Sequence, residues 1–145
     1  MYRSMLVAID GSGNANKALE VALQLARGSG AKLYLIHVPS HLPAEDALGR
    51  QTGASSINET PESFREAGLQ IVNTAIGTLD LAGIVTETLI VDGKPAEAIL
   101  DQARRHDVDA IVMGHRGLGH VAEMMGGSVS RYVNHHAACR VITVS

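Results

Sequence analysis

The residues best suited to binding chemistry lie in a glycine-rich stretch, residues 113–130. The apolar run at 109–113 is typical of a buried strand, and a helical pattern opens at Ser128. A strand, a glycine-rich loop and a helix start can together present backbone N–H groups and the positive end of a helix dipole to an anion. The stretch therefore predicts a phosphate site.

The spacing of the glycines narrows the kind of phosphate site. Gly117 follows Gly114 by three positions, and nine residues separate it from the pair Gly127 and Ser128. Glycines let the backbone approach a phosphate closely, the Gly-Ser pair supplies a hydroxyl and free N–H groups, and Arg116 can add positive charge. The stretch lacks the lysine of a Walker A loop and the third glycine of a dinucleotide loop. The alternative is that it forms only a long turn.

A carboxylate ends another apolar run. Asp10 follows residues 5–9 and precedes the turn Gly11-Ser12-Gly13, and Val38 closes the next apolar run. Ligands of open α/β sheets bind outside the carboxyl ends of the strands, where the winding direction switches. If the strands at 5–9 and 110–113 are neighbours, Asp10 and the glycine-rich stretch face one crevice. The alternative role for Asp10 is to cap the following helix.

The elements that must position these residues alternate along the chain. Apolar runs predict strands at 5–9, 32–38, 83–91, 110–113 and 140–144. Helical periodicity predicts helices from a cap at Asn14 or Asn16 to Gly28, from Thr60 to about 81, from Pro95 to about 106, and from Ser128 to about 136. This alternation is typical of an α/β, three-layer sandwich around a five-stranded, mostly parallel sheet, and we expect a single domain over 1–145. The polar residues Thr86, Glu87 and Thr88 favour an edge position for the strand at 83–91.

Composition excludes several classes of partner. A net charge of -3 without blocks of like charge argues against nucleic acid binding. The longest apolar runs have about five residues, far fewer than the roughly 20 that span a bilayer, so we expect no membrane insertion. Cys139 is the only cysteine, which excludes an internal disulfide, fits a reducing compartment and favours the cytoplasm. Residues 39–60 lack periodicity and form either a surface excursion or a lid.

The histidines have structural interpretations. Cys139 follows His135 by four positions and His136 by three, a helical spacing that could suit a metal, but no further ligand lies close in sequence, so surface and packing roles are favoured. His37 lies on an apolar strand and is expected to be a hydrogen-bonded core residue rather than a catalyst. We therefore expect no metal ligands.

The segment GHRGLGHVAEMMGGSVSRYVNHHAACRVITVS resembles the universal stress protein family, in its nucleotide-binding branch with the motif G-x2-G-x9-G-[ST]. MLVAIDGS, LYLIHV and GKPAEAIL are similar to other blocks of that family. The resemblance implies a Rossmann-like, adenine nucleotide alpha hydrolase-like fold with sheet order 3-2-1-4-5. It also implies ATP, accompanied by Mg²⁺, and a homodimer or tetramer formed through the last strand.

By matching position, the resemblance implies a nucleotide site. Asp10 would bind the ribose or adenine side, Ala8, Ile9 and Val38 would line the adenine pocket, and Met113 would lie beside the nucleotide. Ribose and phosphates would be held by Gly114, Arg116, Gly117, Gly127, Ser128, Val129 and Ser130. The chain departs from the family pattern in two places: both prolines of H-x-P-C-P-V are absent at 136–141, and His115 replaces a small residue.

The function that this implies is an ATP-binding regulatory or stress-response protein acting as a homo-oligomeric, nucleotide-dependent switch. One alternative is a slow ATPase or phosphotransferase that uses the same pocket. Another is a nucleotide-free scaffold that regulates a protein partner such as a transporter. Because no Walker lysine is present and Asp10 is the only carboxylate placed by a motif, no catalytic residue is assigned and slow or no turnover is expected.

Overall fold

The computed structural model describes residues 1–39, 61–115 and 127–145. Its centre is a parallel five-stranded sheet of order β3-β2-β1-β4-β5. The strands are β1 (Ser4–Ala8), β2 (Lys32–His37), β3 (Thr86–Ile90), β4 (Ala110–Gly114) and β5 (Arg140–Val144). The predicted α/β fold and strand order are confirmed, and β3 lies at an edge as its polar sequence predicts.

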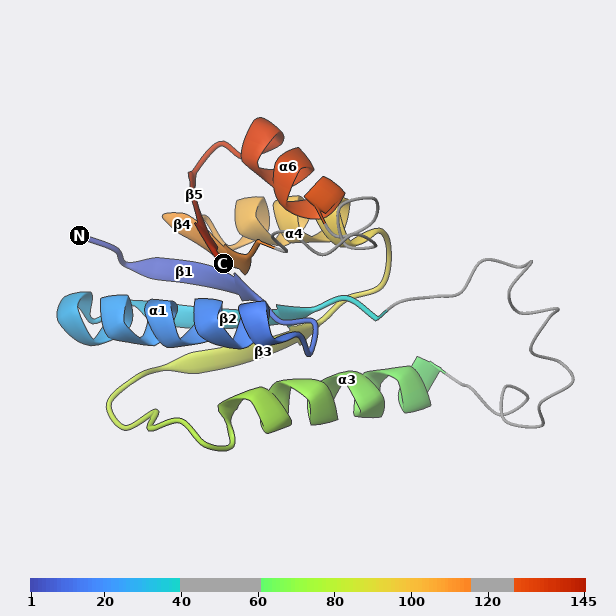
Figure 1. Ribbon diagram of the computed structural model, residues 1–145, viewed down its shortest axis with the longest axis horizontal. Helices are drawn as coiled ribbons and strands as arrows, with labels where there is room; N and C mark the ends of the chain where they lie inside the picture. The colour runs from blue at the N-terminus through green and yellow to red at the C-terminus, as the bar shows by residue number, and fades with distance from the viewer. Residues whose placement is uncertain (40–60, 116–126) are drawn as a thin grey trace, which may run out of the picture.

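Helices cover both faces of the sheet, which gives three layers (Figure 1). They are α1 (Gly13–Ser29), α3 (Pro61–Ile76), α4 (Pro95–Arg105) and α6 (Gly127–His136). Successive strand residues point to opposite faces, so Met5 and Val7 pack in the core with α1 and α3, whereas Leu6 packs in a second core with α4 and α6. In the described part of the chain, no helix is both long and apolar enough to cross a membrane.

The sheet winds in opposite directions from its central strand. β1 pairs with β2 on one side and with β4 on the other, so that Met5 lies opposite both Leu33 and Ala110. This adjacency makes the space between the carboxyl ends of β1 and β4 the topological switch point of the sheet. Asp10 and Gly114, which lie at those two ends, are therefore brought to the same edge.

The start of α1 differs from the prediction. Its N-cap is Ser12, whose hydroxyl accepts a hydrogen bond from the Ala15 amide at 3.1 Å. Neither Asn14 nor Asn16 is the cap, because the chain enters the helix two residues before Asn14 and four before Asn16. The side chain of Asn14 is thereby available for a contact outside the helix.

The end of α3 also differs. The predicted helix continues to about residue 81, whereas α3 ends at Ile76, where the Gly77 amide donates to the Thr74 carbonyl instead of continuing the helical ladder. Leu79 and Leu81 still pack against the core of α1 and α3. These two leucines are apolar because the turn that follows the helix is buried. A prediction from periodicity alone therefore extends the helix through them.

Candidate functional site

The loop after β1 is built as a tight turn into α1. Asp10 is exposed, and its Oδ1 accepts the Ser12 amide at 2.9 Å, which closes a turn through Gly11, whose φ is 86°. The helix cap itself is Ser12, so the alternative role for Asp10 as the cap is wrong. Asp10 instead shapes the turn at the switch point.

The residues predicted to line an adenine pocket divide between the two faces of the sheet. Ala8 and Val38 are half-buried and border the core of α4 and α6, whereas the Ile9 side chain is buried in the core of α1 and α3. The backbone of Ile9 is also engaged, because its amide donates to Ile36 at 2.8 Å and its carbonyl accepts from His37 Nδ1 at 2.7 Å. Only Ala8 and Val38 of the three thus present side chains on a common face.

His37 lies at the carboxyl end of β2 and is 7% exposed. Because a carbonyl only accepts hydrogen bonds, the bond to Ile9 places a hydrogen on Nδ1 of His37. The buried, hydrogen-bonded position is the one predicted for this residue. It fixes the backbone of the two strand ends relative to one another.

Gly114 ends β4 where the first turn of α1 comes closest. A Cβ at this position would lie 2.7 Å from the carbonyl carbon of Asn14 and 2.8 Å from the Ala15 nitrogen. Both distances are too short for real atoms, and the atoms met belong to backbone. Glycine is therefore required here for helix-to-strand contact, a role that the motif-based interpretation missed.

His115 joins three other elements at the start of the glycine-rich stretch. Its amide donates to the Val144 carbonyl at 2.7 Å, and its carbonyl accepts from Asn14 Nδ2 at 2.7 Å. Its ring nitrogen Nδ1 lies 3.2 Å from the hydroxyl of Ser130. The residue thus connects β5, α1 and α6 at the carboxyl edge of the sheet. Its side-chain partner could not be inferred from sequence spacing.

The first turn of α6 lies beside this edge. The helix begins at Gly127 and includes Ser128, and the contact with His115 brings Ser130 next to the end of β4. Ser130 is 3% exposed and Val129 is half-buried against the second core. Met113 is 4% exposed in that same core, so its side chain is a packing element.

Two predicted site residues, Arg116 and Gly117, lie outside the described residues. The backbone of the other predicted residues lies at the carboxyl edge, but the side chains of Ile9 and Met113 are buried in the two cores. This arrangement offers a carboxylate turn, a half-buried apolar wall at Ala8 and Val38, and the N–H groups of a helix start. Such a combination suits a ligand with an apolar ring system and an anionic group.

The histidines near the C-terminus form a different arrangement. The rings of His135 and His136 meet edge to face at 5.0 Å, and His136 also stacks on Tyr132 at 4.0 Å. Cys139 is half-buried, and burial raises the pKa of its thiol. Within residues 1–39, 61–115 and 127–145, no three His, Cys, Asp or Glu residues are grouped to hold a metal ion.

Known proteins with the same sequence pattern and fold supply a comparison. The sequence matches the model of the Universal stress protein family over residues 1–145. Universal stress protein YxiE of Bacillus subtilis is 36% identical over 152 residues, with 99% of each chain covered. A universal stress protein from Thermus aquaticus is 34% identical over 145 residues, again with 99% of each covered.

Solved structures agree with the sequence relatives. A universal stress protein from Archaeoglobus fulgidus superposes with a TM-score of 0.72 at 26% identity, covering 100% of both chains. The structure of an Archaeoglobus fulgidus protein in complex with dAMP gives a TM-score of 0.70 at 27% identity, covering 99% of this chain and 98% of that one. A universal stress protein in complex with cAMP gives 0.63 at 25% identity, with 99% and 97% covered. By its sequence and its fold, the chain belongs to the universal stress protein family.

Proposed function

We propose that this protein binds ATP at the switch point between β1 and β4 and acts as a nucleotide-dependent regulatory protein in the stress response. The observation that carries the proposal is the meeting of the Asp10 turn, the His115 junction and the first turn of α6 at one edge of the sheet. Relatives of the same fold whose structures are complexes with dAMP and cAMP support an adenine nucleotide as the ligand.

The proposed pose follows the chemistry of the edge. The adenine lies against the half-buried side chains of Ala8 and Val38, and Asp10 accepts hydrogen bonds from the ribose hydroxyls. The phosphates lie at the first turn of α6, where Gly127 and Ser128 contribute N–H groups that the helix leaves without intrahelical partners. Arg116 and Gly117 complete the phosphate contacts in this proposal, and Mg²⁺ accompanies the phosphates.

Holding the nucleotide is the proposed task, with slow turnover at most. Phosphoryl transfer requires a positioned nucleophile and neutralisation of charge on the transferred group. Asp10 accepts the Ser12 amide and, in the proposed pose, the ribose hydroxyls, so its carboxylate is not placed at the transferred phosphate. An ATP-bound and an ATP-free form that differ around His115 would supply the regulatory switch.

The proposed assembly is a homodimer, or a tetramer built from it, formed through β5. This strand is at the edge of the sheet, and its residues Val141, Ile142 and Val144 are only half-buried. An edge strand with apolar residues favours pairing with another strand, and a second copy supplies the same one. We propose a single domain over 1–145 and a cytoplasmic location, where ATP is supplied and Cys139 stays reduced.

Nucleotide content and affinity test the proposal. The purified protein is denatured, any released nucleotide is identified, and ATP binding is measured by calorimetry with and without Mg²⁺. We expect an adenine nucleotide or saturable ATP binding, with phosphate release slower than about 1 s⁻¹, the low end of ordinary turnover. Absence of both released nucleotide and ATP binding would overturn the proposal in favour of a nucleotide-free scaffold, and faster release would favour an ATPase.

A matched pair of valine variants locates the site. Gly127→Val places a branched side chain at the first residue of α6, beside the N–H groups proposed for the phosphates, and we expect it to abolish ATP binding. Gly28→Val is the control, because a Cβ at Gly28 meets nothing within 4 Å. The residue lies near the C-terminal end of α1, whereas the proposed site is at the N-terminal end of that helix. If the Gly127→Val protein is folded and binds ATP as tightly as the Gly28→Val protein, the proposed position of the phosphates is wrong.

A further inference from the structure

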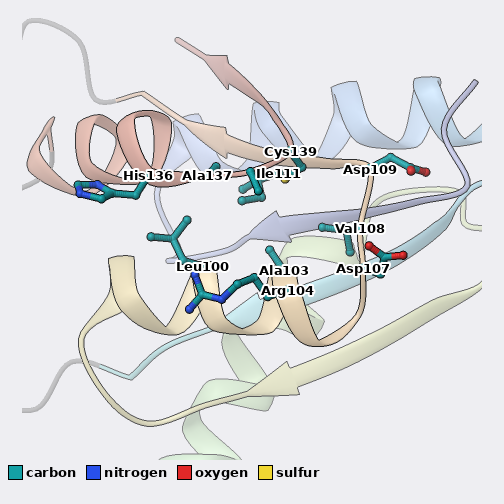
Figure 2. A pocket seen from close by; sticks show the side chains of 11 residues that line it. Leu100, Ala103, Arg104, Asp107, Val108, Asp109, Ile111, His136, Ala137 and Cys139 are labelled. Carbon is teal, nitrogen blue, oxygen red and sulfur yellow. The ribbon is translucent and has the colours of Figure 1, made fainter.

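A cavity of about 400 Å³ opens between α4 and α6 (Figure 2). It is bordered by Val108 and Asp109, which precede β4, and by Cys139, which precedes β5. These positions are at the amino ends of the strands, opposite to the edge where ATP is proposed to bind. The cavity is therefore separate from the candidate nucleotide site, and its volume is within the range of small-molecule pockets, roughly 300–1,000 Å³.

The inner wall of the cavity is apolar. Ile111 is fully buried, and Leu100, Ala103 and Val108 are buried members of the same core cluster. The small side chains of Ala103, Ala137 and Ala138 border the space between the two helices, which explains why it is not filled. A ligand that enters would therefore lay an apolar body against the core of α4 and α6.

The rim carries charge that is separated between its two ends. Figure 2 shows Arg104 extending beneath Leu100 toward the end where His136 lies, with Asp107 and Asp109 at the other end. Asp109 is already satisfied, because it accepts the amides of Arg3 and Ser4 and lies 3.8 Å from the Arg3 guanidinium. Asp109 therefore offers little net attraction to a cation, and the charge of Asp107 is screened because that residue is exposed to solvent.

Arg104 is exposed and is the only lysine or arginine among the described residues that border the cavity. Its neighbour Arg105 pairs with Asp101 at 2.9 Å, whereas Arg104 makes no ion pair within the described residues. A guanidinium is permanently charged and presents a fork of donors that matches a carboxylate. His136 contributes no donor at this end, because its Nδ1 donates to the Tyr132 carbonyl at 2.9 Å and the Nε2 of the neutral ring can only accept, which leaves Arg104 as the group that would hold a carboxylate.

We propose that this cavity binds a small monocarboxylate with an apolar body, its carboxylate at Arg104 and its body against Leu100, Ala103, Ile111 and Ala137. The site goes beyond nucleotide binding, and it is independent of whether ATP binds at the other edge. A neutral molecule of the same shape lacks the partner for Arg104, and an ammonium of the same shape meets it with like charge.

Cys139 supplies the readout, because it borders the cavity and is the only cysteine of the chain. The rate of its alkylation by iodoacetamide is measured at fixed pH with increasing hexanoate, and then with hexanol and hexylammonium. We expect hexanoate to slow alkylation in a saturable way, and the other two probes to protect at least about tenfold more weakly, as expected for loss of a charge-assisted hydrogen bond. Calorimetry with hexanoate should give the same affinity.

Two pairs of variants complete the test. Arg104→Gln should weaken hexanoate binding about tenfold, whereas Arg105→Gln, which loses only the pair with Asp101, should leave it unchanged. Ala137→Leu should fill the cavity and abolish protection, whereas Ala67→Leu, on the exposed face of α3, should not.

Three outcomes would overturn the proposal. They are protection by hexanol equal to that by hexanoate, no protection by hexanoate, and equal affinities in Arg104→Gln and Arg105→Gln. If hexanoate gives no protection and the alkylation rate falls as the protein concentration rises, the cavity is assigned instead to contact with a second copy.

Discussion

The side-chain amide of Asn14 donates a hydrogen bond to the main-chain carbonyl of His115 across 2.7 Å. This bond ties the first turn of α1 to the chain that leaves β4, although 101 positions separate the two residues in sequence. It lies between the Asp10 turn and the His115 contact with Ser130. The carboxyl edge is therefore held as one connected unit before any ligand arrives.

Removing this bond should loosen the edge. Asn14→Ala is expected to lower the free energy of unfolding by about 1 kcal/mol, the usual net contribution of one hydrogen bond. Asn16→Ala is the control, since Asn16 is exposed in the same turn of α1 and its side chain has no bond to the β4 loop within the described residues. Urea unfolding of both variants checks the difference, and a larger loss in the Asn16 variant would contradict this role of Asn14.

Adding one methyl group at Gly114 should destabilise the protein. The new Cβ of Gly114→Ala would lie 2.7 Å from the Asn14 backbone, so α1 or β4 must shift, and overpacking of this kind costs about 1–3 kcal/mol. Gly28→Ala should instead stabilise the protein by about 0.5–1 kcal/mol, because the position is helical and a Cβ there meets nothing within 4 Å. Thermal or urea unfolding should therefore show changes in the free energy of unfolding of opposite sign for the two alanine variants. Equal changes would contradict the close approach of α1 to Gly114.

The His115 side chain should affect the phosphates more than the adenosine part of the ligand. Its ring contacts Ser130 in the first turn of α6, so we expect His115→Ala to weaken ATP binding about fivefold to tenfold, the equivalent of one hydrogen bond, with adenosine binding nearly unchanged. His115→Asn places an amide atom close to the position of Nδ1 and should recover much of the loss. Calorimetry with ATP and adenosine measures both effects, and equal weakening of the two ligands would show that the ring does not act through α6.

Acid should release the N-terminal strand through Asp109. Backbone hydrogen bonds from Arg3 and Ser4, with the nearby Arg3 charge, hold the pKa of this carboxyl below its usual value. A lowered folded-state pKa contributes stability that is complete above the unfolded pKa, about 3.9, and is lost as the pH falls through the folded pKa. Stability should therefore drop in the range below about pH 4, and Asp109→Asn should lack this part of the drop.

The neighbouring acid provides the control for that experiment. Asp107 is exposed and has a positive φ of 49°, a conformation that asparagine tolerates, so Asp107→Asn keeps the backbone. Urea midpoints measured from neutral pH down to about pH 3 should show the acid-induced drop in this variant as in the unchanged protein. The same slope in all three proteins would rule out Asp109 as its source.

The fold was readable from the sequence because its signals are local. Buried parallel strands such as Met5 to Val7 and Ala110 to Met113 are continuous apolar runs, and the alternation with helices leaves few topologies. The errors were also local ones. Leu79 and Leu81 continue the apolar pattern of α3 while the chain has already left the helix at Gly77, because burial and helicity are different properties.

The candidate site was predictable only in outline. The topological rule correctly brings Asp10 and Gly114 to one edge, because it depends on strand order alone. The roles of Asn14 and His115, and the steric need for Gly114, depend on how closely α1 packs against the end of β4. Sequence spacing contains no such distance between residues far apart in the chain. The nucleotide-binding roles of all the predicted site residues stay predictions, and Arg116 and Gly117 lie outside the described residues.

The most direct test of the central claim is an ATP titration followed by amide NMR of the whole protein. If ATP binds at the switch point, the largest changes should come from Ala8, Asp10, Val38, His115 and Ser130, with the amino ends of β4 and β5 unaffected. Spectra that do not change with ATP, or whose changes cluster away from the carboxyl ends of β1 and β4, would contradict the account.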